Sequence, residues 1–95
     1  MLKDPAYTPR GCFKDDKPRA LTYLGIRVTA VEQCYAQAKK RGYDIFAVQN
    51  GDECWVQLPS DQHDKYGNAK NCYDGKGGVM TNNVYQIGNI KHFCK

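Results

Sequence analysis

Five cysteines are the residues of this chain with the clearest chemical potential. No two of them are separated by only two residues, as most zinc ribbons and thioredoxin-like redox sites require. Single cysteines about 20 residues apart are typical of disulfides that join distant parts of a small extracellular domain. The spacing therefore predicts a disulfide framework, with a reduced cytosolic chain as the alternative. The cysteines are Cys12, Cys34, Cys54, Cys72 and Cys94.

The spacing does not decide which cysteines pair. Five cysteines leave one over, and about 15 arrangements of two disulfides are possible. An odd cysteine in a secreted protein forms an intermolecular bridge or remains a free thiol. Both outcomes stay open from the residues alone.

Candidate catalytic groups are few. Ser60 is the only serine, and no nucleophile-elbow spacing surrounds it or the nearby His63. The acidic pairs at 15–16 and 52–53 stand in predicted turns, where neighbouring side chains point in different directions. We therefore expect a protein that is not an enzyme.

Oxygen ligands for a metal gather in one polar stretch. Calcium takes about six to eight oxygens, but the spacing here differs from that of an EF-hand, and acidic loops are usually just solvated. We expect no cofactor, and calcium is the one alternative kept open. His63 is expected to be an ordinary loop histidine. The possible oxygen ligands are Asp61, Asp64, Asn68, Asn71 and Asp74.

Aromatic residues make up 12% of the chain and include seven tyrosines and one tryptophan. Sugars lay their apolar faces on aromatic rings, while amides and charged groups hold the hydroxyls. Tyr66 and Tyr73, in a polar loop, are the first candidates for such contacts. For Trp55 the alternative is core packing against a disulfide. The full candidate set is Tyr66, Tyr73, Asn82, Asn83, Arg19, Tyr23, Gln49 and Trp55.

The net charge of +4 is modest and the basic residues are scattered. Nucleic-acid binders usually carry a denser basic stripe with aromatic residues, so no nucleic-acid partner is expected, although an acidic polysaccharide remains possible. No stretch approaches the roughly 20 apolar residues that span a bilayer. The first five residues carry no apolar signal region, so any export signal is expected to have been removed.

The clearest local element is a helix at about residues 30–41. Thr29 and Glu32 fit a capping box at its start, and the basic residues 39–41 fit the negative end of its dipole. Gly42 is a natural terminator. One helical face carries Val31, Cys34, Tyr35 and Ala38.

Strand patterns surround this helix. Residues 20–24 predict a short strand and residues 83–87 a final one. Asn50-Gly51 between two apolar runs predicts a hairpin, and the continuous run 45–48 predicts a strand covered on both faces, one of them by the helix. Residues 58–78 read as a long loop fastened by Cys72.

Several segments in order resemble the WSC-type domain, a cysteine-rich, glycan-associated extracellular module. They are Gly11-Cys12-Phe13-Lys14-Asp15, Arg19-Ala20-Leu21, the helix with Cys34 and Ala38, Gly42-Tyr43, the run from Phe46 to Trp55, Tyr66-Gly67, Cys72, Gly77-Gly78 and Asn82-Asn83-Val84-Tyr85. A group of secreted marine-invertebrate domains is especially similar in the closing pattern. The resemblance divides the chain into an irregular lead-in at 1–10, a single domain at 11–87 and a tail at 88–95.

The resemblance implies an α+β fold, in which a small twisted antiparallel sheet is crossed by one helix, similar to PAN/apple domains. It also implies the disulfides Cys34–Cys54 and Cys12–Cys72, which leave Cys94 unpaired or intermolecular. Related domains usually carry one further bridge, at positions that correspond here to Ala38 and Val56.

The function implied is that of a secreted, non-enzymatic glycan-binding or matrix-adhesion module. The alternative is a protein-interaction module, either a structural matrix component or a defence or venom effector. The expected partner is an extracellular glycan or matrix protein, with a possible disulfide-linked homodimer through Cys94.

Overall fold

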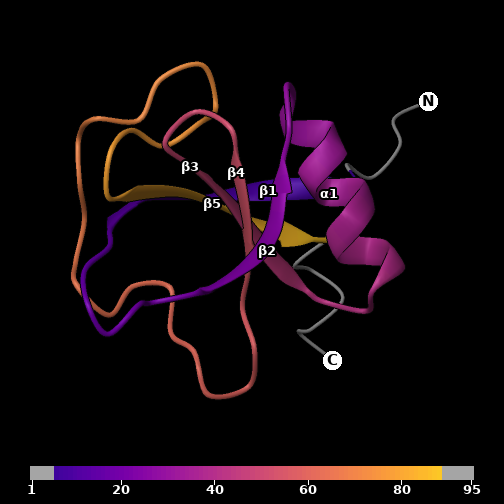
Figure 1. The fold of residues 1–95 in the computed structure, drawn as a ribbon, viewed down its shortest axis with the longest axis horizontal. Coiled ribbons are helices and arrows are strands. Elements are labelled where there is room, and N and C mark those ends of the chain that lie inside the picture. Colours follow the sequence, from indigo (N-terminus) through magenta and orange to yellow (C-terminus); the bar gives the residue numbers. More distant parts are fainter. Residues whose placement is uncertain (1–5, 89–95) are drawn as a thin grey trace.

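The computed structural model describes residues 6–88, which form one sheet and one helix (Figure 1). The five strands lie in the order β1-β5-β3-β4-β2, and every neighbouring pair is antiparallel. The predicted α+β architecture with a single helix is therefore confirmed. Along the chain the elements are β1 (Tyr7–Lys14), β2 (Thr22–Arg27), α1 (Val31–Lys40), β3 (Ile45–Gln49), β4 (Glu53–Val56) and β5 (Thr81–Ile87).

The central strand of the sheet is β3. It is buried from Phe46 to Gln49, as expected for a strand covered on both faces. In the turn to β4, Asn50 and Gly51 have φ values of 54° and 79°, the left-handed region that these two residue types tolerate best. The hairpin predicted from Asn-Gly is confirmed.

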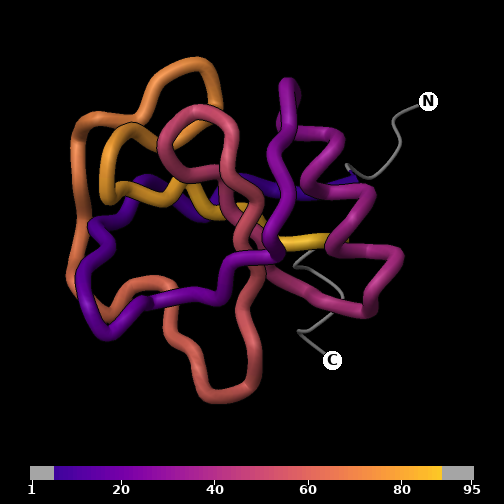
Figure 2. Tube along the Cα trace, in the orientation of Figure 1, coloured from indigo at the N-terminus to yellow at the C-terminus, as the bar shows by residue number. Residues whose placement is uncertain are grey.

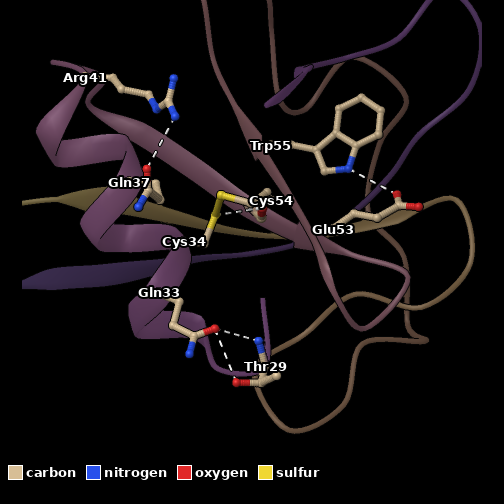
Figure 3. The surroundings of a disulfide bond; sticks show 9 residues. Thr29, Gln33, Cys34, Gln37, Arg41, Glu53, Cys54 and Trp55 are labelled. Atoms are coloured by element: carbon tan, nitrogen blue, oxygen red, sulfur yellow. Dashed lines mark hydrogen bonds between the residues drawn. A yellow bond between two sulfur atoms is a disulfide. The ribbon is translucent and has the colours of Figure 1, made fainter. Parts of the chain in front are cut away.

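Helix α1 packs across one face of the sheet, against β3 and β4 (Figure 1). Its bounds agree with the predicted 30–41 to within one residue at each end. The predicted capping box between Thr29 and Glu32 is wrong, because the helix begins one residue later than that box requires. Instead the Gln33 side-chain oxygen accepts from the Thr29 amide at 2.7 Å and from its hydroxyl at 3.2 Å (Figure 3).

Both faces of the sheet are buried, because successive side chains of a strand point to opposite sides. The opposite face from α1 carries a smaller core of Leu21, Ala47, Trp55 and Val84. Figure 1 shows the helix on one side of the strands and much of the long loop after β4 on the other, although Gly75 near the end of that loop accepts from the Tyr85 hydroxyl of the helix-side core. We call the two faces the helix side and the loop side. The helix-side core contains Val28, Cys34, Ala38, Phe46, Val48, Cys54, Val56 and Tyr85.

Two disulfides fasten this fold, with the pairing that the family resemblance implied. Cys12–Cys72 joins β1 to the long loop, and Cys34–Cys54 joins α1 to β4. The sequence separations of 60 and 20 residues correspond, in the chain-entropy account, to about 4 and 3 kcal/mol of stabilisation. The resemblance places a further bridge of related domains at the positions of Ala38 and Val56. In this chain both residues are fully buried in the helix-side core. Cys94 lies outside the described residues.

Three strands differ from the prediction, among them β5, which begins at Thr81 rather than at residue 83. The residue patterns predicted no strand at β1. It starts at Tyr7, so residues 7–9, assigned to an irregular lead-in, pair with β5, and Arg10 lies at a bulge. Pro9 concealed this strand, but an edge strand tolerates proline because one of its sides needs no hydrogen bonds. β2 runs from Thr22 to Arg27 rather than over 20–24, since Ala20 and Leu21 enter the core before the ladder starts.

The long connection from β4 to β5 is held by main-chain contacts as well as by Cys72. A β-bridge pairs Phe13 with Asn68, and the amides of Asn50 and Gly51 donate to the carbonyls of Gly78 and Gly77. Figure 2 shows this part of the connection beside the β3–β4 turn. Within residues 6–88 no helix is long and apolar enough to cross a membrane.

Candidate functional site

Three side chains form a stack on the loop side of the sheet. Tyr23 and Trp55 are cross-strand neighbours on β2 and β4, with ring centroids 5.1 Å apart. The guanidinium carbon of Arg19 lies 5.2 Å from the Trp55 ring centroid, within the distance of a cation–π contact. Tyr23 is 40% exposed and the Arg19 side chain 36%, whereas Trp55 is 6% exposed. Tyr23 and Arg19 therefore form the accessible surface, and Trp55 supports it from beneath.

Trp55 is packed in the core, as that alternative expected, but it packs on the loop side with Leu21, Ala47 and Val84 rather than against the neighbouring disulfide. Cys54 faces α1, and Trp55 points to the other side of β4 (Figure 3). The physical reason is the alternation of side chains along a strand. On the loop side the indole Nε1 donates to Glu53 Oε1 at 3.3 Å.

The carboxylate of Asp15 fixes the position of the Arg19 guanidinium in the stack. This carboxylate is fully buried and accepts from Arg19 Nη1 at 3.0 Å. It also accepts from Gln49 Nε2 at 2.9 Å and from the amides of Ala20 and Asp16 at 2.9 and 2.8 Å. Charge-assisted hydrogen bonds of this kind fix geometry as well as adding stability. The loop before β2 is thereby organised around one carboxylate.

Hydrogen bonding keeps this buried carboxylate ionised. Burial is the largest single influence and by itself would raise the pKa of Asp15. The bonds from Ala20, Gln49, Arg19 and Asp16 together outweigh it, so the pKa lies below its ordinary value of 3.8. The charges of Asp15 and Arg19 therefore offset each other at neutral pH.

The predicted amide candidates occupy different places. Gln49 and Asn82 are 3% and 0% exposed, and Gln49 Nε2 donates to Asn82 Oδ1 at 2.9 Å. Asn82 Nδ2 is buried without a hydrogen-bond partner among the described residues. These amides order the interior beside Asp15 rather than present themselves to solvent. Asn83, the next residue of β5, points to the helix side, so the two asparagines cannot serve one ligand.

The two loop tyrosines are also separated. The Tyr66 hydroxyl donates to the carbonyl of Pro18, which directly precedes Arg19, and Lys65 Nζ lies 5.4 Å from the centroid of the Tyr66 ring. Tyr73 is 56% exposed and lies beside Gly51 of the β3–β4 turn. The structure thus brings Tyr66 to the border of the stack and places Tyr73 at a different turn.

His63 is built into the fold. It is 9% exposed, its ring packs edge-on against Phe13 with centroids 5.2 Å apart, and Nδ1 lies 2.9 Å from Gln57 Oε1. Because an amide oxygen only accepts, Nδ1 carries the hydrogen. Burial lowers the pKa of His63 below 6.5, and Asp64 raises it by a smaller amount. The imidazole is engaged by Gln57 and Phe13 rather than by Ser60.

Two of the side chains considered for calcium already bond to neighbouring strands and to the loop. Asp61 Oδ2 accepts from Thr22 Oγ1 at 2.7 Å and from the Leu58 amide at 2.9 Å. Asn71 Oδ1 accepts from Thr81 Oγ1 at 2.8 Å. In the part of the chain that the structure describes, no three His, Cys, Asp or Glu side chains gather as a metal site.

Sequence reasoning overlooked Asp15 as part of the site and treated it as one of two turn carboxylates. The available signal was its position four residues before Arg19, the partner that it holds. Gln49 is 34 residues away in the chain, so its contact with Asp15 depends on the sheet and not on any local pattern.

Comparison with known protein families finds one match, the WSC domain, over residues 9–77. The matched region contains Asp15, the whole stack and all four bonded cysteines. It ends before β5, so the special resemblance to marine-invertebrate domains stays a prediction. A comparison with curated proteins finds no match. Because the match covers most of its length and the fold and disulfides agree with it, the chain belongs to the WSC domain family.

Proposed function

We propose that this WSC domain is a secreted glycan-binding or matrix-adhesion module that acts by binding, without catalysis. The observation that carries the proposal is the exposed surface of Tyr23 and Arg19 over Trp55. A tyrosine ring offers a flat apolar face to a sugar ring. A guanidinium offers hydrogen-bond donors to its hydroxyls.

Arg19 has donors left for a ligand. Its Nη1 group is used by Asp15 and lies 3.3 Å from Met80 Sδ. Its Nε and Nη2 groups make no hydrogen bond within residues 6–88. Because Asp15 and Trp55 already fix the side chain, a ligand does not have to order it, and preorganisation of this kind favours affinity.

Secretion is supported by the two disulfides. Such bonds persist in oxidising compartments and are rare in the reducing cytosol. A domain of this size also has a small core, so the bridges supply stability that burial alone does not.

A glycan array tests the proposal directly. The oxidised protein is applied to neutral and acidic glycans, with and without calcium. Binding to a defined glycan class that is reduced by Tyr23→Ala would support the proposal. An array without any binder under either condition would contradict it. If binding required calcium, the oxygen ligands of the loop after β4 would again be candidates for a calcium site.

The alternative function, a protein-interaction module, is favoured by a different surface. Tyr73 and Val79 are 56% and 71% exposed in the connection before β5, and exposed apolar side chains are typical of interaction sites when they gather. A pull-down from extracellular matrix that depends on these two residues, together with a negative glycan array, would select this alternative.

Disulfide-linked dimerisation through Cys94 stays a prediction. The other four cysteines are bonded to one another, and an odd cysteine is available to pair with a second copy. Electrophoresis of fresh protein with and without reductant tests it. A dimer band that disappears on reduction would support the dimer, and a monomer under both conditions would select the alternative of a free thiol.

A further inference from the structure

A groove of about 610 Å³ lies away from the stack, at the end of the sheet where β3 begins and β4 ends. Its walls are the connection from α1 to β3 and the residues that follow β4, which can be followed in Figure 1. Small-molecule sites are typically about 300–1,000 Å³, so the groove has the size of such a site. The lining of the groove includes Tyr43, Asp44, Ile45, Gln57, Leu58 and Gln86.

Main-chain hydrogen bonds fix the walls. The Tyr43 amide donates to the last turn of α1 at Ala38, at 2.9 Å. The Asp44 carbonyl accepts from the Ile87 amide at 2.7 Å, and the Gln57 amide donates to the Ile45 carbonyl at 3.0 Å. The groove is therefore preformed, and a ligand does not have to order its backbone.

Gln57 lines the groove, and one end of its side-chain amide is already held by His63. Its Oε1 accepts from the His63 amide at 3.0 Å and faces His63 Nδ1 at 2.9 Å. With the oxygen held by two donors, the Nε2 group is the end that remains for a ligand, and it donates to no partner within the described residues. Gln57 is thus a positioned hydrogen-bond donor.

Asp44 supplies the complementary acceptor. The residue is exposed, and its carboxylate takes part in no ion pair or side-chain hydrogen bond within residues 6–88. Among the described residues it is the only charged one that lines the groove. A sulfated or carboxylated sugar would face this carboxylate, while the one guanidinium bonded to a lining side chain within residues 6–88, that of Arg10, is engaged by Gln86 Oε1 at 3.4 Å.

Apart from Gln86, whose Oε1 accepts from Arg10 Nη1 at 3.4 Å, the remaining lining side chains are mainly apolar. Ile45, Leu58 and the ring of Tyr43 contact the hydrophobic cores and also border the groove. An apolar surface beside one fixed amide donor and one carboxylate acceptor matches the chemistry of a pyranose, which has apolar C–H faces and a rim of hydroxyls.

We propose that this groove is a second binding subsite for an uncharged pyranose ring, with Asp44 and Gln57 holding its hydroxyls. The inference rests on the proposed glycan-binding function and adds a site that shares no residue with the stack. A glycan with several residues would then engage the module at two places, which raises its overall affinity.

The test is an NMR titration of the isotope-labelled oxidised protein. The probes are the methyl β-pyranosides of glucose, galactose and N-acetylglucosamine, with glucuronic acid as the charged comparison. At least one neutral probe is expected to give saturable shifts at residues 43–45, 57–58 and 86, and glucuronic acid to bind less tightly. Absence of these shifts with all three neutral probes, or equal binding of glucuronic acid, overturns the inference.

Variants separate this subsite from the stack. Asp44→Asn, which replaces a charged acceptor by a weaker neutral one, and Gln57→Met, which removes a donor, should each weaken binding at the groove by about fivefold, equivalent to about 1 kcal/mol. Asp74→Asn, the same change at an exposed turn, should leave it unchanged. Because Asp44 is exposed, Asp44→Asn is expected to fold. It therefore still tests the subsite if Gln57→Met does not fold. Unchanged groove binding in Asp44→Asn overturns the inference.

The pattern of shifts also separates this inference from the proposed function. Shifts confined to Arg19, Tyr23 and Trp55 refute the groove and leave glycan binding at the stack intact. Shifts confined to the groove support the inference and refute the stack. No saturable shift at either place refutes both for these sugars.

Discussion

The guanidinium of Arg19 lies over the indole ring of Trp55, 5.2 Å from its centroid, and Asp15 Oδ2 accepts from Arg19 Nη1 at 3.0 Å. The Trp55 ring belongs to β4, and the neighbouring Tyr23 ring belongs to β2. Arg19 and Asp15, which form the ion pair, belong to the loop before β2. Two segments distant in the sequence, residues 15–23 and β4, thus meet at one exposed surface. The predictions that follow depend on this arrangement.

Asp15→Ala should lower the free energy of unfolding by about 2–4 kcal/mol, because it leaves buried donors at Ala20 and Gln49 without an acceptor. Urea unfolding at neutral pH measures the loss. The matched control is Asp16→Ala, which removes an exposed carboxylate and should cost less than about 1 kcal/mol. Equal losses of stability in the two variants would contradict the claim that the hydrogen bonds of the Asp15 carboxylate hold this loop together.

Stability should fall in two separate steps as the solution is acidified. In the folded state the pKa of His63 lies below 6.5, so the unfolded chain binds more protons there, and stability falls as the pH drops from 6.5 toward the folded pKa. The pKa of Asp15 lies below 3.8, so its contribution is present above 3.8 and is lost as the pH falls through the folded pKa.

Unfolding free energies measured from pH 7 to pH 2 should resolve both steps. His63→Asn should remove the upper step only, and Asp15→Asn the lower step only. A His63→Asn protein that still loses stability between pH 6.5 and pH 5 would contradict the assignment to this histidine.

Arg19→Lys should weaken the stack while it keeps the positive charge. Lysine lacks the planar guanidinium that stacks on an aromatic face and donates in several directions, so we expect about a threefold to tenfold loss of glycan affinity, of the order of one exposed cation–π contact. Trp55 is the only tryptophan in the chain, so its fluorescence should change as well. The matched control is Arg41→Lys at the exposed end of α1, which should alter neither quantity.

The two disulfides should differ in their response to mild reduction. Cys34 and Cys54 are 0% exposed, whereas Cys12 and Cys72 are partly exposed, and thiol–disulfide exchange requires access of the attacking thiolate. Timed reduction, alkylation and peptide mass spectrometry should therefore find Cys12 and Cys72 labelled first. Labelling of Cys34 and Cys54 at the earliest times would contradict this order.

Local patterns in the sequence predicted much of the fold. The hairpin follows from Asn50-Gly51, and α1 follows from its periodic apolar face and basic last turn. The capping box failed because Gln33, the neighbour of Glu32, reaches Thr29. The disulfides required the family resemblance, since spacing alone left every pairing open.

The site was predicted in part, because its geometry depends on pairing between distant strands. Arg19, Tyr23 and Trp55 were candidates from their residue types, but their contact requires the β2–β4 ladder. The buried positions of Gln49 and Asn82 follow from strand alternation and from the loop that covers the sheet. The groove joins the start of β3 to the end of β4, and no motif signals such a site.

The most direct test of the central claim is a titration of Trp55 fluorescence with the glycan that binds on the array. Three oxidised proteins are compared: the wild type, Tyr23→Ala, and Tyr73→Ala as a second exposed tyrosine away from the stack. The account predicts a saturable change in the wild type and in Tyr73→Ala. It predicts about tenfold weaker binding in Tyr23→Ala, as expected for the loss of about 1.4 kcal/mol. Undiminished affinity in Tyr23→Ala, with the loss transferred to Tyr73→Ala, would contradict it.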